Sequence, residues 1–531
     1  MLIRHKPPRE LGLNEPLRHP DHQLPVTRRE LIARGFRTGA AVVTVPSALS
    51  LLAPRDAHGA LAPDIEALKE ACGITDGAGK IPFIGFDLAG GANLAGSEVL
   101  IGGPGGQLDF LTTAAYGRLG LPGDMVPNAP NAASATNNFV DTSLGLAWHS
   151  DGAMLRGILS KMSPEALALT NGAVIAARSE NDTANNPHNP MYGIQRCGAD
   201  GQLLTLIGSR ASDSGGNSMA PMPYDIAYRP TKVDRTSDVT GLVDTGKLAQ
   251  LMAQNDAVAV LESMVRMSGR KLDRIDTRVS RDAAIKTLVE CGYTKTAYLA
   301  DRFGVPANLN PELDTRIKGA TGIFTDAQFD ADGEYEKTAA VMKMVIEGYA
   351  GAGTITMGGY DYHGQGRATG EVRNFRAGEC IGACLEFAHR AAKPLMLYVF
   401  SDGSLSSDNQ VDNSANGRGK FMWVSDNQAT ANSFFLVYNP GGRAVVTPST
   451  SSFRNGNQIG YYTRDGAVAN NSHPGANAVN LLVNTVLLNY LALHQEIGRF
   501  TTLFPGHGLG AQLDSLAVFA PIVDAVITNP I

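Results

Sequence analysis

Apolar runs alternate with helical patterns in the second half of the chain. Apolar residues recur at the i, i+3 and i+4 spacing of a helix over about 335–350 and 370–393. Each helix is followed by an almost continuous apolar run, 354–357 and 394–403, that ends at polar residues. Strands without alternating polar positions are typical of a parallel sheet that helices cover on both faces. We therefore expect an α/β fold.

The first half of the chain contains three further strand candidates. A buried strand over 81–86 runs into a glycine-rich turn, and a second short strand is expected within 97–110. A third strand over 171–179 leads into a polar loop. Glycine, asparagine, aspartate and serine cluster between the elements, so we expect long polar loops, which is where functional sites usually lie.

Helical patterns fill the middle of the chain. The stretches 245–270 and 280–304 both have apolar residues at helical spacing. We therefore expect a helical insertion around 240–350 within a single large domain that spans 61–531. The apolar stretch 480–494 contains two asparagines, so we expect a core helix there and not a membrane span.

Side chains that bind metals follow the predicted strands. Asp361 and His363 come directly after one apolar strand, and Asp402 ends the next. Asp87 ends the strand over 81–86, and Asn93 lies in the glycine turn beyond it. Because the carboxyl ends of parallel strands meet at one edge, these side chains are expected to converge there. Carboxylates and an imidazole suit zinc or manganese; the alternative is a surface aspartate beside a hydrogen-bonded loop histidine.

The N-terminus has the features of an export signal. Two adjacent arginines, Arg28 and Arg29, precede a weakly apolar stretch over 38–53. This order is typical of a twin-arginine signal, which the twin-arginine translocase recognises. We therefore expect an exported protein, periplasmic or on the cell surface, that is not an integral membrane protein.

The boundaries of this signal are less well defined by the sequence. Cleavage after Gly59 and cleavage after Ala62 both fit the small residues found there. The alternative is a surface helix that Thr27 caps, with Glu30 three residues further on. In either case we assign 1–60 to a signal and polar lead outside the folded domain.

Composition excludes one class of partner. The chain has 531 residues, of which 18% are charged, and a formal net charge of −6. It contains no basic block with interleaved aromatic residues, so nucleic acid is not an expected partner.

The five cysteines show no C-x-x-C spacing, and we expect small buried residues and no structural disulfide framework. They are Cys72, Cys197, Cys291, Cys380 and Cys384.

Short islands of this sequence resemble a known family. They are similar to twin-arginine-exported bacterial proteins of undefined function in the alkaline phosphatase/sulfatase superfamily. The most specific island is "GGYDYH" at 358–363, which resembles that family's "GGWD-x-H". Weaker counterparts are 90–93 for "GG-x-D-G", 187–189 with Gly198 for "SHF" and a later glycine, and 401–403 for "SE-F-G-R".

The resemblance implies a doubly wound, mostly parallel sheet with helices on both faces. It also implies a site with one or two metal ions and a Ser, Thr or formylglycine nucleophile. The metal-ligand candidates are Asp87, Asn93, Asp361, His363, Asp402 and His473, with His507 as an alternative to His473.

The sequence departs from the family pattern at two positions, and it also lacks the histidine that would follow Asp402 in a metallophosphatase. Asn93 stands where the family has aspartate, which would weaken metal binding, and Pro187 stands where the family has a hydroxyl. Thr183 is our candidate nucleophile, with Ser179 and Ser150 as alternatives, and His188 is a second catalytic candidate. Arg178 and Arg210 are candidates for holding a substrate anion.

Two functions from different classes follow. The first is an exported metal-dependent hydrolase that acts on a small anionic ester, either a phosphate or a sulfate. The second is an exported non-catalytic binding or assembly protein on the same scaffold, with a surface or periplasmic protein as its partner. A phosphate-moving isomerase of the same superfamily is a third. Fold alone does not choose among them.

Overall fold

The fold is described here from a computed structural model. The described residues are 61–72, 74, 79–127, 138–180, 187–209, 230–242, 254–276, 282–303, 306–449 and 451–524. The predictions for Arg28, Arg29, Thr183 and Arg210 lie outside these residues.

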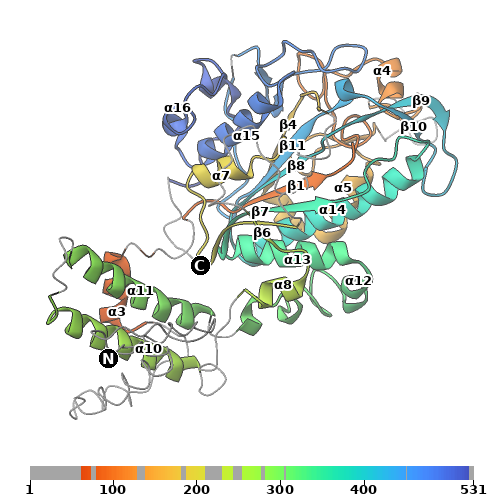
Figure 1. Ribbon diagram of the computed structural model, residues 1–531. Helices are drawn as coiled ribbons and strands as arrows, with labels where there is room; N and C mark the ends of the chain where they lie inside the picture. Colours follow the sequence, from red (N-terminus) through yellow and green to blue (C-terminus); the bar gives the residue numbers. More distant parts are fainter. Residues whose placement is uncertain are drawn as a thin grey trace, which may run out of the picture.

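Nine strands of the described residues form one sheet (Figure 1). Their order across the sheet is β12-β13-β4-β11-β8-β1-β7-β5-β6. β11 and β12 run antiparallel to their neighbours, and the other pairs are parallel. The strands are β1 (Phe83–Leu88), β4 (Thr170–Ile175), β5 (Leu204–Gly208), β6 (Thr231–Lys232), β7 (Ala350–Met357), β8 (Leu395–Phe400), β11 (Ser433–Tyr438), β12 (Arg454–Asn455) and β13 (Gln458–Ile459). The predicted α/β class with a mostly parallel sheet is confirmed.

Helices cover both faces of this sheet. On one face, the core contains residues of α5 (Ala153–Lys161), α13 (Gly333–Ile346) and α14 (Arg367–Arg390). On the other face, it contains residues of α7 (Met191–Arg196) and α15 (Val479–Leu493). Ile84 and Phe86 of β1 belong to the first core and Phe83 to the second, so the central strands are buried on both faces, which explains why they are mostly apolar. The core helix expected over 480–494 is confirmed as α15.

Shorter strands and helices complete the fold. Two small two-stranded sheets pair β9 (Leu405–Val411) with β10 (Phe421–Asp426), and β2 (Val140–Asp141) with β3 (Trp148–His149). The short helices are α4 (Thr113–Arg118), α6 (Pro164–Ala168), α8 (Thr236–Thr240), α12 (Asp326–Ala331) and α16 (Phe500–Leu503), with 3-10 turns at Pro306–Leu309, Pro311–Leu313, Gln428–Thr430, Ile497–Arg499 and Leu513–Leu516. Within the described part of the chain, no helix is both long enough and apolar enough to cross a membrane.

The strand expected within 97–110 is wrong. Val99 forms only isolated bridges, with Ala95 and Trp148. Four glycines and a proline follow between 102 and 106 and turn the chain back on itself, so that the Gly103 amide donates to the Asp109 carbonyl. A strand cannot continue through that turn.

Three helices form a separate arm beside the sheet (Figure 1). α3 (Pro63–Ala71), α10 (Gln254–Leu272) and α11 (Asp282–Phe303) surround a small apolar core of their own. That core consists of Leu61, Ile65, Val258, Val265, Ala297 and Tyr298.

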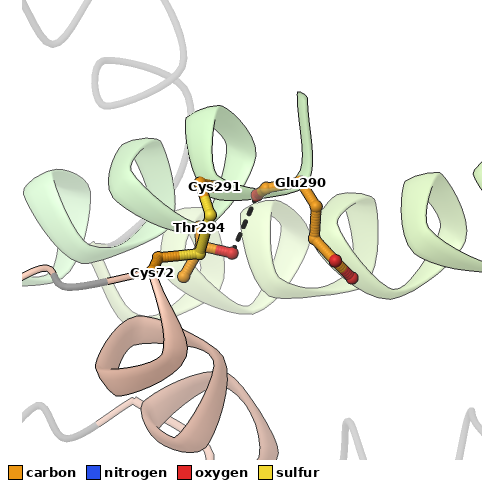
Figure 2. Close-up of a disulfide and its surroundings, with 4 residues drawn as sticks. All are labelled: Cys72, Glu290, Cys291 and Thr294. Atoms are coloured by element: carbon orange, nitrogen blue, oxygen red, sulfur yellow. Dashed lines mark hydrogen bonds between the residues drawn. A yellow bond between two sulfur atoms is a disulfide. The ribbon is translucent and has the colours of Figure 1, made fainter. Parts of the chain in front are cut away.

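A disulfide joins two helices of this arm. Cys72, at the end of α3, is bonded to Cys291 in the middle of α11 (Figure 2). The expectation that these two cysteines are free buried residues is therefore wrong. The pairing joins positions 219 residues apart, a separation that gives no pairing signal in a single sequence. Cys197, Cys380 and Cys384 are buried and free, as expected.

Candidate metal centre

Asp361, His363 and Asp426 form the one cluster of the described residues in which three such side chains are placed to share a metal ion. Each offers one ligand atom, and these atoms lie within 4.8 Å of one another. The His363 Nδ1 atom is hydrogen-bonded to the Asp361 carboxylate and lies 3.6 Å from the Asp426 Oδ1 atom. All three side chains are open to solvent, with 44% of His363, 60% of Asp361 and 47% of Asp426 exposed.

The alternation "YDYH" explains why Asp361 and His363 face solvent. Tyr360 and Tyr362 are buried on either side of Asp361. The Tyr360 hydroxyl donates to the Arg373 carbonyl at 2.9 Å, so the tyrosine is anchored on α14. The Tyr362 amide donates to the Tyr360 carbonyl at 3.1 Å, so the chain turns at Asp361 between the two buried rings. Burial of the two tyrosines therefore turns Asp361 and His363 outward.

Asp426 reaches the cluster from the β9–β10 hairpin. It is the last residue of β10. The Gln365 amide donates to the Trp423 carbonyl at 2.7 Å, and this bond holds the loop after β7 against the hairpin. Asp426 was not predicted from the sequence. The signal that could have found it is "FMWVSD" at 421–426, an apolar run that ends in a carboxylate like those after β1, β7 and β8.

Asp402 lies at the same edge of the sheet but outside the cluster. It is 1% exposed, and its Oδ1 atom accepts a hydrogen bond from the Gly90 amide at 2.8 Å. Gly90 adopts a φ of +126°, and a Cβ atom there would lie 2.4 Å from the Asp361 amide nitrogen. Asp402 therefore holds the glycine turn against which the Asp361 backbone rests.

Asn93 and Asp87 are both buried, and both are hydrogen-bonded. The Asn93 Nδ2 atom donates to the Leu405 carbonyl at 2.8 Å, and its Oδ1 atom accepts from the Ala95 amide at 3.1 Å. Asp87 lies within β1 and accepts from the Thr356 hydroxyl at 3.3 Å. Asp87 is not part of the three-ligand cluster, and the Asn93 Oδ1 atom, its one potential metal ligand, is engaged by the Ala95 amide.

The predicted histidines His188 and His473 also lie outside the cluster. Both are buried, and burial lowers the pKa of each imidazole to about 4. The His473 Nε2 atom donates to the Ala176 carbonyl at 2.9 Å, while its Nδ1 atom accepts from the Gly475 amide at 3.2 Å. With both ring nitrogens engaged, His473 has none left for a metal.

A half-buried arginine contacts the loop that carries Asp361 and His363. The Arg373 guanidinium rests on Gly359, where a Cβ atom would lie 2.9 Å from the Arg373 Cζ atom. Gly359 is two residues from Asp361. Among the described residues, no carboxylate forms an ion pair with Arg373 or with the predicted Arg178. Arg373 was not predicted as a site residue, because the position of an arginine in a helix does not reveal where its guanidinium group lies.

The donor set fits a divalent transition metal. One imidazole and two carboxylates are ligands that zinc and manganese accept. Exposed side chains can turn by a rotamer step, so the 4.8 Å spread can close around one ion at metal–ligand distances of about 2.0–2.2 Å. The hydrogen bond between Asp361 and His363 would be replaced when the ion binds.

Comparison of the chain with protein-family models, with curated proteins and with solved structures gave no match.

Proposed function

We propose that this protein is an exported, metal-dependent hydrolase of phosphate or sulfate esters with an alkaline phosphatase-like fold. The observation that carries the proposal is the cluster of Asp361, His363 and Asp426 beside the carboxyl end of β7. Parallel α/β sheets bind ligands outside the carboxyl ends of their strands. The resemblance of "GGYDYH" to the exported superfamily members supports the same assignment.

Each residue then has a distinct task. Asp361, His363 and Asp426 would hold zinc or manganese, which supplies a Lewis acid for a phosphoryl or sulfuryl oxygen and lowers the pKa of a bound water. Arg373 binds the anionic ester group, because its guanidinium has no competing carboxylate among the described residues. Asp402 is a positioning residue that fixes the Gly90 turn under Asp361.

The disulfide supports the proposed export. Disulfides such as Cys72–Cys291 persist in the periplasm or at the cell surface and are rare in a reducing cytosol. We propose that Arg28 and Arg29 direct the chain to the twin-arginine translocase. This argument from the disulfide is independent of the signal sequence.

A second candidate function is an exported metal-binding protein without turnover. The observation that favours it is that Asn93 and His473 are engaged in structural hydrogen bonds. The predicted residues therefore supply no second set of metal ligands at the cluster. Its partner would be a surface or periplasmic protein.

Hydrolysis assays separate the two candidates. Purified protein loaded with zinc or manganese is tested on an aryl phosphate and an aryl sulfate, beside Asp361→Ala/His363→Ala. Asp465→Ala, which removes another exposed carboxylate, is the matched control. Turnover that the double variant loses and the control keeps supports the hydrolase. Bound metal without turnover on either ester supports the binding protein.

A further inference from the structure

The helical arm exposes more large apolar side chains than the rest of the described molecule. Six of the eleven exposed large hydrophobic residues lie on it, and four of those six belong to α11. They are Met267, Ile275, Ile285, Leu288, Val289 and Tyr293. Exposed apolar residues that cluster in this way mark interaction sites.

The α11 residues lie on one side of the helix. At 100° per residue, Ile285, Leu288, Val289 and Gly292 share one face, with Tyr293 at its border. Thr294, Ala297 and Tyr298, which are buried, share the opposite face. We call the apolar set of Ile285, Leu288, Val289, Gly292 and Tyr293 the outward stripe. A surface helix normally shows polar residues to solvent, so this stripe reverses the usual pattern.

Gly292 leaves room for a close neighbour in the outward stripe. A Cβ atom at this position would meet no atom within 4 Å. Glycine inside a helix costs about 1 kcal/mol relative to alanine. The open surface at Gly292 allows another side chain to approach the helix backbone.

We propose that the outward stripe docks on the same stripe of a second copy of this chain. A twofold axis between Leu288 and Val289 pairs the two α11 helices antiparallel. Ile285 of each copy then sits opposite Gly292 of the other, because both positions are equally far from the axis. Leu288 and Val289 lie next to their own counterparts. Isologous contacts of this kind are the commonest in soluble oligomers.

The charges around the stripe favour a second copy over an anionic membrane. From position 282 to position 295, α11 carries two acidic residues, Asp282 and Glu290, and two basic residues, Lys286 and Lys295. Lys286 already pairs with Asp282 at 2.7 Å. Two such surfaces meet without net repulsion, whereas attraction to anionic lipids needs a net positive face.

The disulfide restrains α11 before it docks. Cys291 lies within the length of the stripe, and its bond to Cys72 ties this part of α11 to α3 (Figure 2). A surface that is already rigid loses less conformational freedom when it binds. Docking therefore does not require the arm to order itself first.

Sedimentation or light scattering of the full chain tests the proposal. Wild-type protein is expected to form a dimer, and Leu288→Asp is expected to raise the dissociation constant at least tenfold. Leu288 is 75% exposed, so its replacement leaves the fold unchanged, which far-UV circular dichroism verifies. Leu313→Asp is the matched control, because Leu313 is 63% exposed and lies away from the arm's apolar core. A monomer at the highest soluble concentration overturns the proposal, and so does a dimer that Leu288→Asp leaves intact.

A cross-link locates the contact. Leu288→Cys adds an exposed thiol to a chain whose other free cysteines are buried. Mild oxidation is expected to give a covalent dimer, whereas Leu313→Cys is expected to give none. A monomer whose introduced thiol is protected, or one that sediments with lipid vesicles, assigns the stripe to a different occupant and overturns the proposal.

Discussion

The Nδ1 atom of His363 lies 3.6 Å from the Oδ1 atom of Asp426, although the strands that bring them there, β7 and β10, belong to different sheets. His363 comes from the loop after β7 and Asp426 from the end of the β9–β10 hairpin. The hydrogen bond from the Gln365 amide to the Trp423 carbonyl joins loop and hairpin. The candidate metal centre therefore depends on the hairpin as well as on the large sheet.

Arg373→Ala is expected to weaken substrate binding more than turnover. The guanidinium beside Gly359 would contact the anionic ester in both the ground state and the transition state. Its removal therefore raises KM by about tenfold or more while kcat changes little. Steady-state kinetics on the active ester measures both constants, and Arg373→Lys should recover part of the loss. An unchanged KM would contradict the assignment of Arg373.

Asp402→Ala is expected to destabilise the fold without removing the metal. The variant loses the buried hydrogen bond from the Gly90 amide, which costs about 2 kcal/mol in the free energy of unfolding. Denaturant titration measures this loss, and Asp402→Asn, which keeps an acceptor oxygen, should lose less. If Asp402→Ala instead releases the metal at unchanged stability, Asp402 is a ligand.

Removal of the disulfide is expected to loosen the arm and spare the sheet. The arm has only a small apolar core, so Cys72→Ser/Cys291→Ser should lower its stability by about 2–4 kcal/mol. Hydrogen exchange measured by mass spectrometry should speed up in α3 and α11 and stay unchanged in β1, β7 and β8. Equal protection of α3 with and without the disulfide would rule out this role.

Acidification from pH 6.5 to pH 4 is expected to lower the free energy of unfolding. Burial lowers the pKa of four histidines from 6.5 to about 4; they are His149, His188, His473 and His494. The unfolded chain takes up their protons near pH 6.5, whereas the folded chain does so only near pH 4. Each histidine therefore costs about 3 kcal/mol of stability across this range.

One carboxyl group changes the free energy of unfolding in the opposite direction as the pH falls. Burial and the nearby Glu371 raise the pKa of Glu98 from 4.5 to about 7, so its contribution to stability grows as pH falls from 7 to 4.5. Four histidines outweigh this single group. Denaturant titrations at several pH values measure the slope, and His473→Asn should reduce the proton uptake on unfolding by about one. A free energy of unfolding that stays flat between pH 6.5 and 4 would refute the account.

Four strands of the large sheet were predictable from their mostly apolar runs. β1, β4, β7 and β8 all fall where these runs predict them, since burial on both faces favours apolar residues, whereas β5, β6, β11, β12 and β13 were not predicted. Asp361 and His363 were found for the same reason, because they follow β7 directly. The strand predicted around Val99 is wrong because this apolar run forms only isolated bridges.

The rest of the site depends on contacts between distant parts of the chain. β9 is mostly polar, and β10, although apolar over its first four residues, is partly exposed, so Asp426 has a weaker strand signal before it than the residues after the central strands. Asn93 and His473 have the residue types of metal ligands, but their hydrogen bonds to Leu405 and Ala176 appear only in the folded chain. The partner of Cys72 is likewise set by the packing of α3 on α11.

Metal content is the most direct test of the central claim, that Asp361, His363 and Asp426 together hold one divalent cation. The full chain is equilibrated with zinc or manganese, freed of excess metal and analysed by mass spectrometry of the elements. Wild type and Asp465→Ala are expected to retain about one ion per chain. Asp426→Ala and Asp361→Ala/His363→Ala are expected to lose it, because each of these two variants removes one or more of the three ligands that the described residues supply. Wild-type protein without metal, or an Asp426→Ala variant that keeps its ion, would contradict the account.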